Sequence, residues 1–94
     1  MNNYESVCIL AQNSTNEQIS NMIVKIQNKI AEFSNGNIKI ENLGKKKLAY
    51  EIKQNKEGTY LVTYFQAKSK DISKLEKFYR MLDEIIKFMT IKED

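Results

Sequence analysis

The spacing of apolar residues changes along the chain, and these changes limit the fold more than any other feature. Between Ile19 and Phe33 the apolar residues recur at intervals of three and four, which is typical of one face of a helix of about five turns. The same spacing returns between Ile72 and Leu82. Alternating apolar and polar residues, or short β-branched runs, predict strands at residues 4–11, 38–53, 59–67 and 85–92. The predicted order is therefore strand, helix, strand, strand, helix, strand.

This order predicts an α+β ferredoxin-like βαββαβ sandwich, in which a four-stranded antiparallel sheet carries two helices on one face. Both long connections run through a helix as right-handed crossovers, so the expected spatial order is 4-1-3-2, with strands numbered along the chain. Residues 38–53 then form an edge strand. We expect one domain over residues 1–94, because a chain of this length has one core and buries roughly 60–70% of its unfolded surface.

Polar residues mark where the predicted elements begin and end. Two overlapping capping boxes, residues 14–17 and 15–18, fit the start of the first helix. Gly36 is expected to end that helix, because glycine accepts the left-handed backbone conformation of many helix C-termini. Asp71 is the expected N-cap of the second helix. The polar residues 54–58 end in a glycine and predict a hairpin loop of three to five residues.

The predicted edge strand at residues 38–53 combines a glycine, a run of lysines and an alternating apolar pattern. Its apolar residues of one parity, which a regular strand places on one face, are Ile38, Ile40, Leu48, Tyr50 and Ile52. Gly44 lies between them, and a bulge or a bend is expected there. Lys45, Lys46 and Lys47 follow directly. Lysines along an edge strand prevent promiscuous pairing, and they are also available to a chosen partner or to phosphate.

The residue types that most enzymes and metal sites need are missing or isolated. The chain has no histidine, and its single cysteine, Cys8, lies in an apolar run without basic neighbours, so neither a Cys/His nucleophile nor a Cys/His metal site is predicted. No glycine belongs to a GxGxxG or GxxxxGK[ST] motif. We therefore expect no catalysis, no cofactor and no small-molecule substrate. The unpaired cysteine and the lack of a signal peptide or long apolar run predict a cytoplasmic protein that does not enter a membrane.

The charge of the chain permits a nucleic-acid partner without requiring one. Fifteen basic and twelve acidic residues give a net charge of +3. The run from Lys45 to Lys47 is either a solvated charge run or a phosphate contact, because phosphate contacts need only basic residues on a rigid element. Arg80 is the only arginine, and its planar guanidinium suits phosphate or carboxylate. Lys87 and Lys92 lie in the predicted last strand.

Aromatic residues on the third predicted strand raise a second route to RNA. In RRM domains, which share this topology, aromatic residues of that strand stack on bases. The corresponding sequence pattern is met here only by Gly58, Val62 and Tyr64, and other positions break it. Cover of the sheet, or contact with a protein, explains Tyr60 and Tyr64 more simply. The pattern therefore does not predict base stacking.

One stretch resembles the signature of a known family. Residues 44–52, Gly-Lys-Lys-Lys-Leu-Ala-Tyr-Glu-Ile, are similar to the signature of the sixth protein of the bacterial small ribosomal subunit, in which a glycine and two or three basic or polar residues precede Leu-Ala-Tyr-x-Ile. Tyr4-Glu5, Glu57-Gly58-x-Tyr60 and the segment 80–92 resemble the same family in order and spacing. The similarity extends over residues 1–94.

The resemblance implies a non-catalytic ribosomal protein with the fold predicted above. Members of that family pair with the eighteenth small-subunit protein, and the heterodimer binds the central domain of small-subunit (16S) rRNA during assembly of the platform. In the family, the edge strand around the signature serves the protein partner. The matching positions of this chain are Lys45, Lys46, Lys47 and Tyr50.

The resemblance also implies which residues contact RNA. Arg80, Lys87 and Lys92 match basic positions that serve RNA in the C-terminal part of the family. Asn2 and Asn3 stand where many relatives carry basic residues, so no phosphate contact is expected at the N-terminus.

Two other functions fit the same topology. A ferredoxin-like regulatory or protein-interaction module without RNA binding would self-associate through the edges of its sheet. A small phosphatase on this fold would need arginine in the loop after the first strand, and residues 12–16 hold no basic residue. The phosphatase is therefore the weakest alternative.

Overall fold

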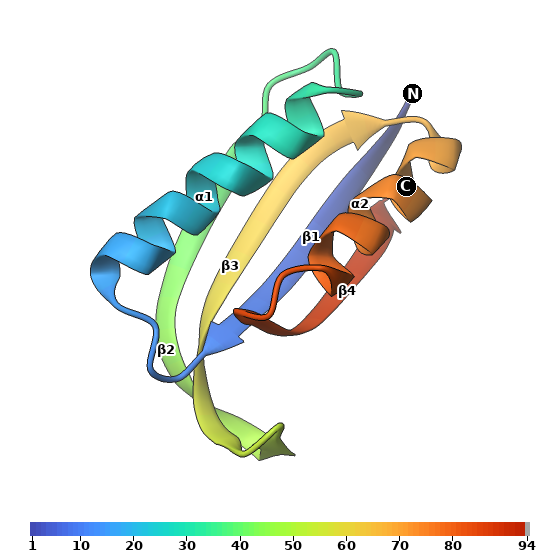
Figure 1. Ribbon diagram of the computed structural model, residues 1–94. Helices are drawn as coiled ribbons and strands as arrows, with labels where there is room; N and C mark the ends of the chain where they lie inside the picture. Colours follow the sequence, from blue (N-terminus) through green and yellow to red (C-terminus); the bar gives the residue numbers. More distant parts are fainter. Residues whose placement is uncertain (94) are drawn as a thin grey trace.

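The chain folds into a βαββαβ sandwich, as predicted. The computed structural model describes residues 1–93. The elements are β1 (Asn2–Ala11), α1 (Asn16–Ala31), β2 (Lys39–Ile52), β3 (Asn55–Ala67), α2 (Ser69–Arg80) and β4 (Ile85–Glu93). The strands form one antiparallel sheet in the order β2-β3-β1-β4, and both helices cover the same face of it (Figure 1). The predicted strand order is thus confirmed, with β2 and β4 at the edges. Neither helix in this part of the chain is long and apolar enough to cross a membrane.

The main core lies between the helices and the sheet. Both helical patterns of the sequence face it. The buried apolar residues of the two helices are Ile19, Met22, Ile26, Ile30, Leu75 and Tyr79. The central strands contribute alternate side chains, such as Cys8 of β1 and Leu61 of β3. Burial of each large apolar side chain contributes about 1.5–3 kcal/mol, so these stripes hold the helices on the sheet.

A small polar cluster is enclosed in this core. The hydroxyl oxygens of Ser6 and Tyr79 lie 2.9 Å apart and share a hydrogen bond, and Thr90 donates a weaker one to Ser6. Burial raises the pKa of Cys8, beside this cluster, to about 12. The thiol therefore stays protonated at neutral pH, and Cys8 behaves as a small core residue.

Cys8 is expected to react slowly with a disulfide reagent such as 5,5′-dithiobis(2-nitrobenzoate). At about pH 8 the folded chain should react roughly a thousandfold more slowly than the chain unfolded in urea, because thiolate is the attacking species and the pKa is raised from 9.0 to about 12. Since the folded state holds this proton more tightly, the free energy of unfolding should fall as the pH rises from about 9 towards 12. Equal labelling rates with and without urea would show that the thiol is accessible.

The ends of α1 follow the prediction only in part. Of the two overlapping capping boxes, the second forms: Thr15 Oγ1 accepts a hydrogen bond from Gln18 N, and Gln18 Oε1 accepts one from Thr15 N. The helix ends at Ala31, and the amides of the next three residues bond back to carbonyls of its last turn. Gly36 does not have a positive φ. The prediction that Gly36 ends the helix was wrong, because the last turn closes without it.

The start of α2 also differs from the prediction. Only Lys68 separates β3 from α2, and it occupies the N-cap in an extended conformation with no side-chain capping bond. Asp71 lies in the first turn, where it is buried and pairs with Lys74 at 3.3 Å. The prediction that Asp71 is the N-cap was wrong, because the helix begins directly after the strand. A carboxylate in the first turn still interacts favourably with the helix dipole.

The turn between β2 and β3 is shorter than predicted. Lys53 and Gln54 form it alone, with φ values of 47° and 67°, and Ile52 pairs with Asn55. Two left-handed central residues are typical of the tight turn that matches the twist of a hairpin. The polar residues that follow extend β3 because Asn55 Oδ1 accepts a hydrogen bond from the backbone amide of Gln12, whose side-chain oxygen accepts one from the amide of residue 56. The predicted three- to five-residue loop was therefore wrong.

A bulge in β2 places the apolar side chains of the two halves of the strand on opposite faces of the sheet. The register with β3 skips Leu43, next to Gly44, whose φ is +85°. The bulge expected at Gly44 is confirmed. Before it, Ile40 packs against the core beneath the helices, whereas after it Leu48 packs with Ile9 on the helix-free face. The shared parity in the sequence therefore does not mean a shared face, because one extra residue reverses the alternation.

Candidate partner and RNA interface

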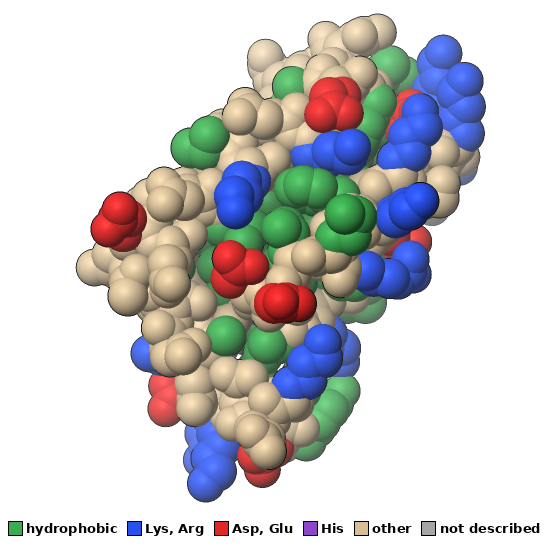
Figure 2. Space-filling model, viewed as in Figure 1, with side chains coloured by type: hydrophobic (Ala, Val, Ile, Leu, Met, Phe, Trp, Pro, Cys, Tyr) green, Lys and Arg blue, Asp and Glu red, His purple; other side chains and the backbone are tan. Residues whose placement is uncertain are grey.

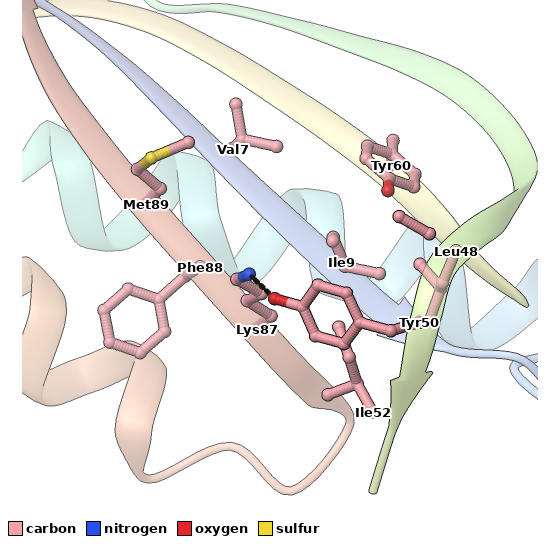
Figure 3. A pocket seen from close by; sticks show the side chains of 10 residues that line it. Val7, Ile9, Leu48, Tyr50, Ile52, Tyr60, Lys87, Phe88 and Met89 are labelled. Carbon is pink, nitrogen blue, oxygen red and sulfur yellow. Dashed lines mark hydrogen bonds between the residues drawn. The ribbon is translucent and has the colours of Figure 1, made fainter. Parts of the chain in front are cut away.

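The helix-free face of the sheet carries an apolar hollow near the β2–β3 turn (Figure 3). It holds about 220 Å³, and the C-terminal half of β2 curls over it towards β4. Its main lining residues are Val7, Ile9, Leu48, Tyr50, Ile52, Tyr60, Lys87 and Met89. Apolar side chains of all four strands thus meet at one exposed place.

Tyr50 and Lys87 join the two edges of the sheet across the mouth of this hollow. Lys87 Nζ donates a hydrogen bond of 2.7 Å to Tyr50 Oη and lies 5.2 Å from the centre of the tyrosine ring (Figure 3). Tyr50 remains 62% exposed. The structure thus brings together a residue predicted to contact protein and one predicted to contact RNA. Sequence reasoning missed this contact, because it depends on how far the hairpin curls over the sheet.

The three consecutive lysines lie exposed on the free edge of β2. Lys45, Lys46 and Lys47 pair in register with the start of β3. Because side chains alternate along a strand, Lys46 shares the face of Leu48 and Tyr50, and the other two point to the opposite face. Among residues 1–93, none of the three forms a salt bridge. The edge therefore presents free charge next to the apolar hollow.

Arg80 and Lys87 lie close together, whereas Lys92 lies apart from them. Arg80 is the last residue of α2, and its guanidinium carbon lies 5.6 Å from the centre of the Phe88 ring. Lys87 precedes Phe88 in β4 and lines the same hollow as Arg80. Lys92 pairs with Tyr4 near the other end of β4, about 17 Å along the strand from Lys87. The predicted RNA residues therefore form one pair and one separate lysine.

The side of the molecule formed by α2 is more basic than the sequence analysis recognised. Lys70, Lys74 and Lys77 follow one another at intervals of four and three on this helix, and all three are exposed. Figure 2 shows Lys and Arg side chains gathered along this side. The helical spacing of these lysines is a signal that could have identified them.

Of the two tyrosines of β3, Tyr64 lies near three glutamates and one lysine, Lys39, whose Nζ is 6.0 Å from the centre of the tyrosine ring. Tyr60 and Tyr64 are on the helix-free face, where Tyr64 is paired in register with Glu5. A hydrogen bond to Glu5 raises the pKa of Tyr64, and the charges of Glu41 and Glu93 raise it further. Carboxylates repel a phosphate backbone, so this end of the face is unfavourable for RNA.

Comparisons with known proteins identify relatives over nearly the whole chain. The sequence model of the family described as Ribosomal protein S6 matches residues 3–92. Over 91 residues the chain is 37% identical to the small ribosomal subunit protein bS6 of Trichormus variabilis, covering 97% of this chain and 84% of that protein. It is 40% identical over 90 residues to the protein of the same name from Thermotoga maritima, covering 95% and 70%. The crystal structure of 30S ribosomal protein S6 from Thermotoga maritima matches with a TM-score of 0.90 at 39% identity, covering 98% of this chain and 87% of that chain.

The fold and these relatives define a structural, non-enzymatic protein of the small ribosomal subunit. No group of three or more metal-ligating side chains comes together within residues 1–93. The chain belongs to the ribosomal protein S6 family. The predictions of family, fold, non-enzymatic role and location in the cytoplasmic ribosome are confirmed by this membership.

Proposed function

We propose that the chain binds 16S rRNA as a heterodimer with the eighteenth small-subunit protein during assembly of the platform. One observation carries this proposal: the two edges of the sheet differ in chemistry. At β2 an exposed backbone edge with three lysines adjoins the apolar hollow. Beside the β4 edge, Arg80 at the end of α2 and Lys87 of β4 have no carboxylate within 4.0 Å among residues 1–93. The first edge suits a protein, and the second suits phosphate.

The proposed protein-binding surface consists of the β2 edge and the apolar hollow beside it. An edge strand has unpaired backbone donors and acceptors, to which a segment of a partner can bind. Tyr50 offers a large exposed ring at the rim of the hollow, and tyrosine is among the residues that contribute most at protein interfaces. Lys45, Lys46 and Lys47 would disfavour pairing between two copies of this edge while allowing a partner with complementary charge.

The proposed RNA-binding surface consists of Arg80, Lys87 and, further along β4, Lys92. The guanidinium of Arg80 can bind two phosphate oxygens at once, and its position over Phe88 limits its motion. The two lysines contribute single positive charges that contact the RNA phosphate backbone and do not distinguish one base from another. Because the net charge is only +3, we expect these contacts to be too few for strong binding by the chain alone.

RNA binding is expected to be strong only when the eighteenth protein is present. The measurement is the affinity for a fragment of the central domain of 16S rRNA over a series of salt concentrations, with and without that protein. We expect tighter binding and a steeper salt dependence for the heterodimer, because more phosphates are neutralised.

A basic protein of similar size without a ribosomal role serves as the control for added charge. Equal RNA affinity with and without the eighteenth protein, or no binding in either case, would defeat the proposal. Partner binding without any RNA binding would instead favour a protein-interaction module.

A further inference from the structure

A second hollow, called here the basic hollow, opens at the start of β4. It holds about 470 Å³ and is lined by basic residues from three distant parts of the chain: Lys53 of the β2–β3 turn, Arg80 at the end of α2, and Lys87 of β4, whose ammonium also borders the apolar hollow. Asp83 is the one acidic residue in its lining. Three positive charges and one negative charge leave a net charge of +2 around the hollow.

None of these three cations is neutralised by a carboxylate of residues 1–93. The salt bridges in this part of the chain are Lys29–Glu32, Lys39–Glu41 and Lys74–Asp71. Asp83 shares the hollow but lies more than 4.0 Å from each cation. Positive charges around one hollow repel one another, and a bound anion offsets this repulsion because it attracts each of them.

Two of the three cations are already oriented by aromatic side chains. Lys87 is held by Tyr50 at 2.7 Å, and Arg80 lies over the ring of Phe88. Lys53 is placed by the backbone, because the tight turn carries it on the hairpin end, which extends beyond the helices (Figure 1). Pre-oriented donors lose less conformational entropy when a ligand binds.

We infer that the basic hollow binds one phosphate group of the rRNA backbone, with Lys53 as a third phosphate contact beside Arg80 and Lys87. This inference rests on the proposed function and extends it, because it makes the tip of the β2–β3 hairpin an RNA-binding element. The planar guanidinium and two ammonium groups match the several oxygen acceptors of a phosphodiester. Lys87 lines both hollows, so the phosphate and the protein partner would bind on either side of this residue.

The test replaces Lys53 with glutamine (K53Q) and compares it with K25Q, which removes an exposed lysine of α1. Glutamine keeps a long unbranched side chain in the turn and removes only the charge. Binding of the 16S central-domain fragment is measured over a salt series with the eighteenth protein present. We expect K53Q to weaken binding about fivefold at about 0.15 M salt and to reduce the salt slope by about one, and K25Q to change neither.

Several outcomes would overturn the inference, and they differ from failure of the proposed function. If the unchanged chain binds RNA and K53Q behaves like K25Q, the inference is wrong and the proposed function stands. If K53Q weakens binding of the eighteenth protein instead of RNA, the hollow serves a protein and the inference is also wrong. If the unchanged chain binds no RNA, both fail. K53R, which keeps the charge, should bind like the unchanged chain and thereby separate loss of charge from a disturbed turn.

Discussion

Gly58→Ala is expected to lower the free energy of unfolding by about 1–3 kcal/mol and the melting temperature by roughly 5–20 °C. Gly58 lies in the middle of the sheet, paired with Ala11 on one side and Lys46 on the other. A Cβ atom here would overlap Cγ2 of Ile9 and lie 2.9 Å from the carbonyl oxygen of Leu10. A backbone carbonyl cannot rotate away like a side chain, so the central strands must move apart.

The other two glycines provide matched controls for Gly58→Ala. At Gly36 a Cβ atom would meet the end of the flexible Gln66 side chain at 3.0 Å, so Gly36→Ala should change stability little. At Gly44 nothing lies within 4 Å, but φ is +85°, so Gly44→Ala should cost about 1 kcal/mol through backbone conformation alone. Thermal unfolding of the three variants should therefore rank Gly58→Ala as the most destabilised. A Gly58→Ala variant as stable as Gly36→Ala would show that the strands adapt without cost.

Tyr50→Ala is expected to weaken binding of the eighteenth protein by about 2 kcal/mol, or roughly thirtyfold. The ring forms part of the rim of the apolar hollow and is 62% exposed, so it is available to a partner. The same exposure means that its removal should change the stability of the isolated chain by less than about 0.5 kcal/mol. Calorimetric titration with the purified partner measures the affinity, and thermal unfolding measures the stability.

Two further variants separate the contributions of the Tyr50 ring, its hydrogen bond and the neighbouring lysines to partner binding. Tyr50→Phe keeps the ring and removes the hydrogen bond to Lys87, so it should retain most of the partner affinity. Joint replacement of Lys45, Lys46 and Lys47 by alanine should weaken partner binding less than Tyr50→Ala and increase self-association, because the edge loses its charges. Unchanged affinity in Tyr50→Ala would move the partner away from this face of the sheet.

The order of elements could be predicted because each element buries one face, and burial imposes a period on the sequence. The helical stripes ending at Phe33 and Leu82 and the strand alternation all reflect this requirement. The ends of elements were less predictable, because local bonds compete there. Asp71 was predicted to be the N-cap but is a buried residue of the first turn. Hydrogen bonds between Gln12 and residues 55 and 56 make polar residues of the predicted loop part of β3.

The candidate interfaces could be predicted only as positions along the chain. The resemblance indicated Lys45 to Lys47, Tyr50, Arg80, Lys87 and Lys92, and their roles stay predictions. Nothing in the sequence indicated that Tyr50 reaches Lys87, or that Lys53 lines the same hollow as Arg80, because both arrangements depend on the twist of the whole sheet and on a turn two residues long. Periodicity reports which face of an element is buried, but not which distant elements converge on one place.

The extra residue at Leu43 is the first of two register shifts in β2, the second lying between Lys47 and Ile52, and it changes the phase of the strand that leads into the apolar hollow. Without it, Leu48 and Tyr50 would follow Ile40 onto the helix side, and the opposite face would lose one wall of its hollow. One strand thereby contributes to two unrelated layers without any additional element. The length of the segment around Gly44 consequently matters as much as its side chains, since inserting or deleting one residue there would exchange the two faces of β2 up to Lys47, beyond which the register shifts a second time.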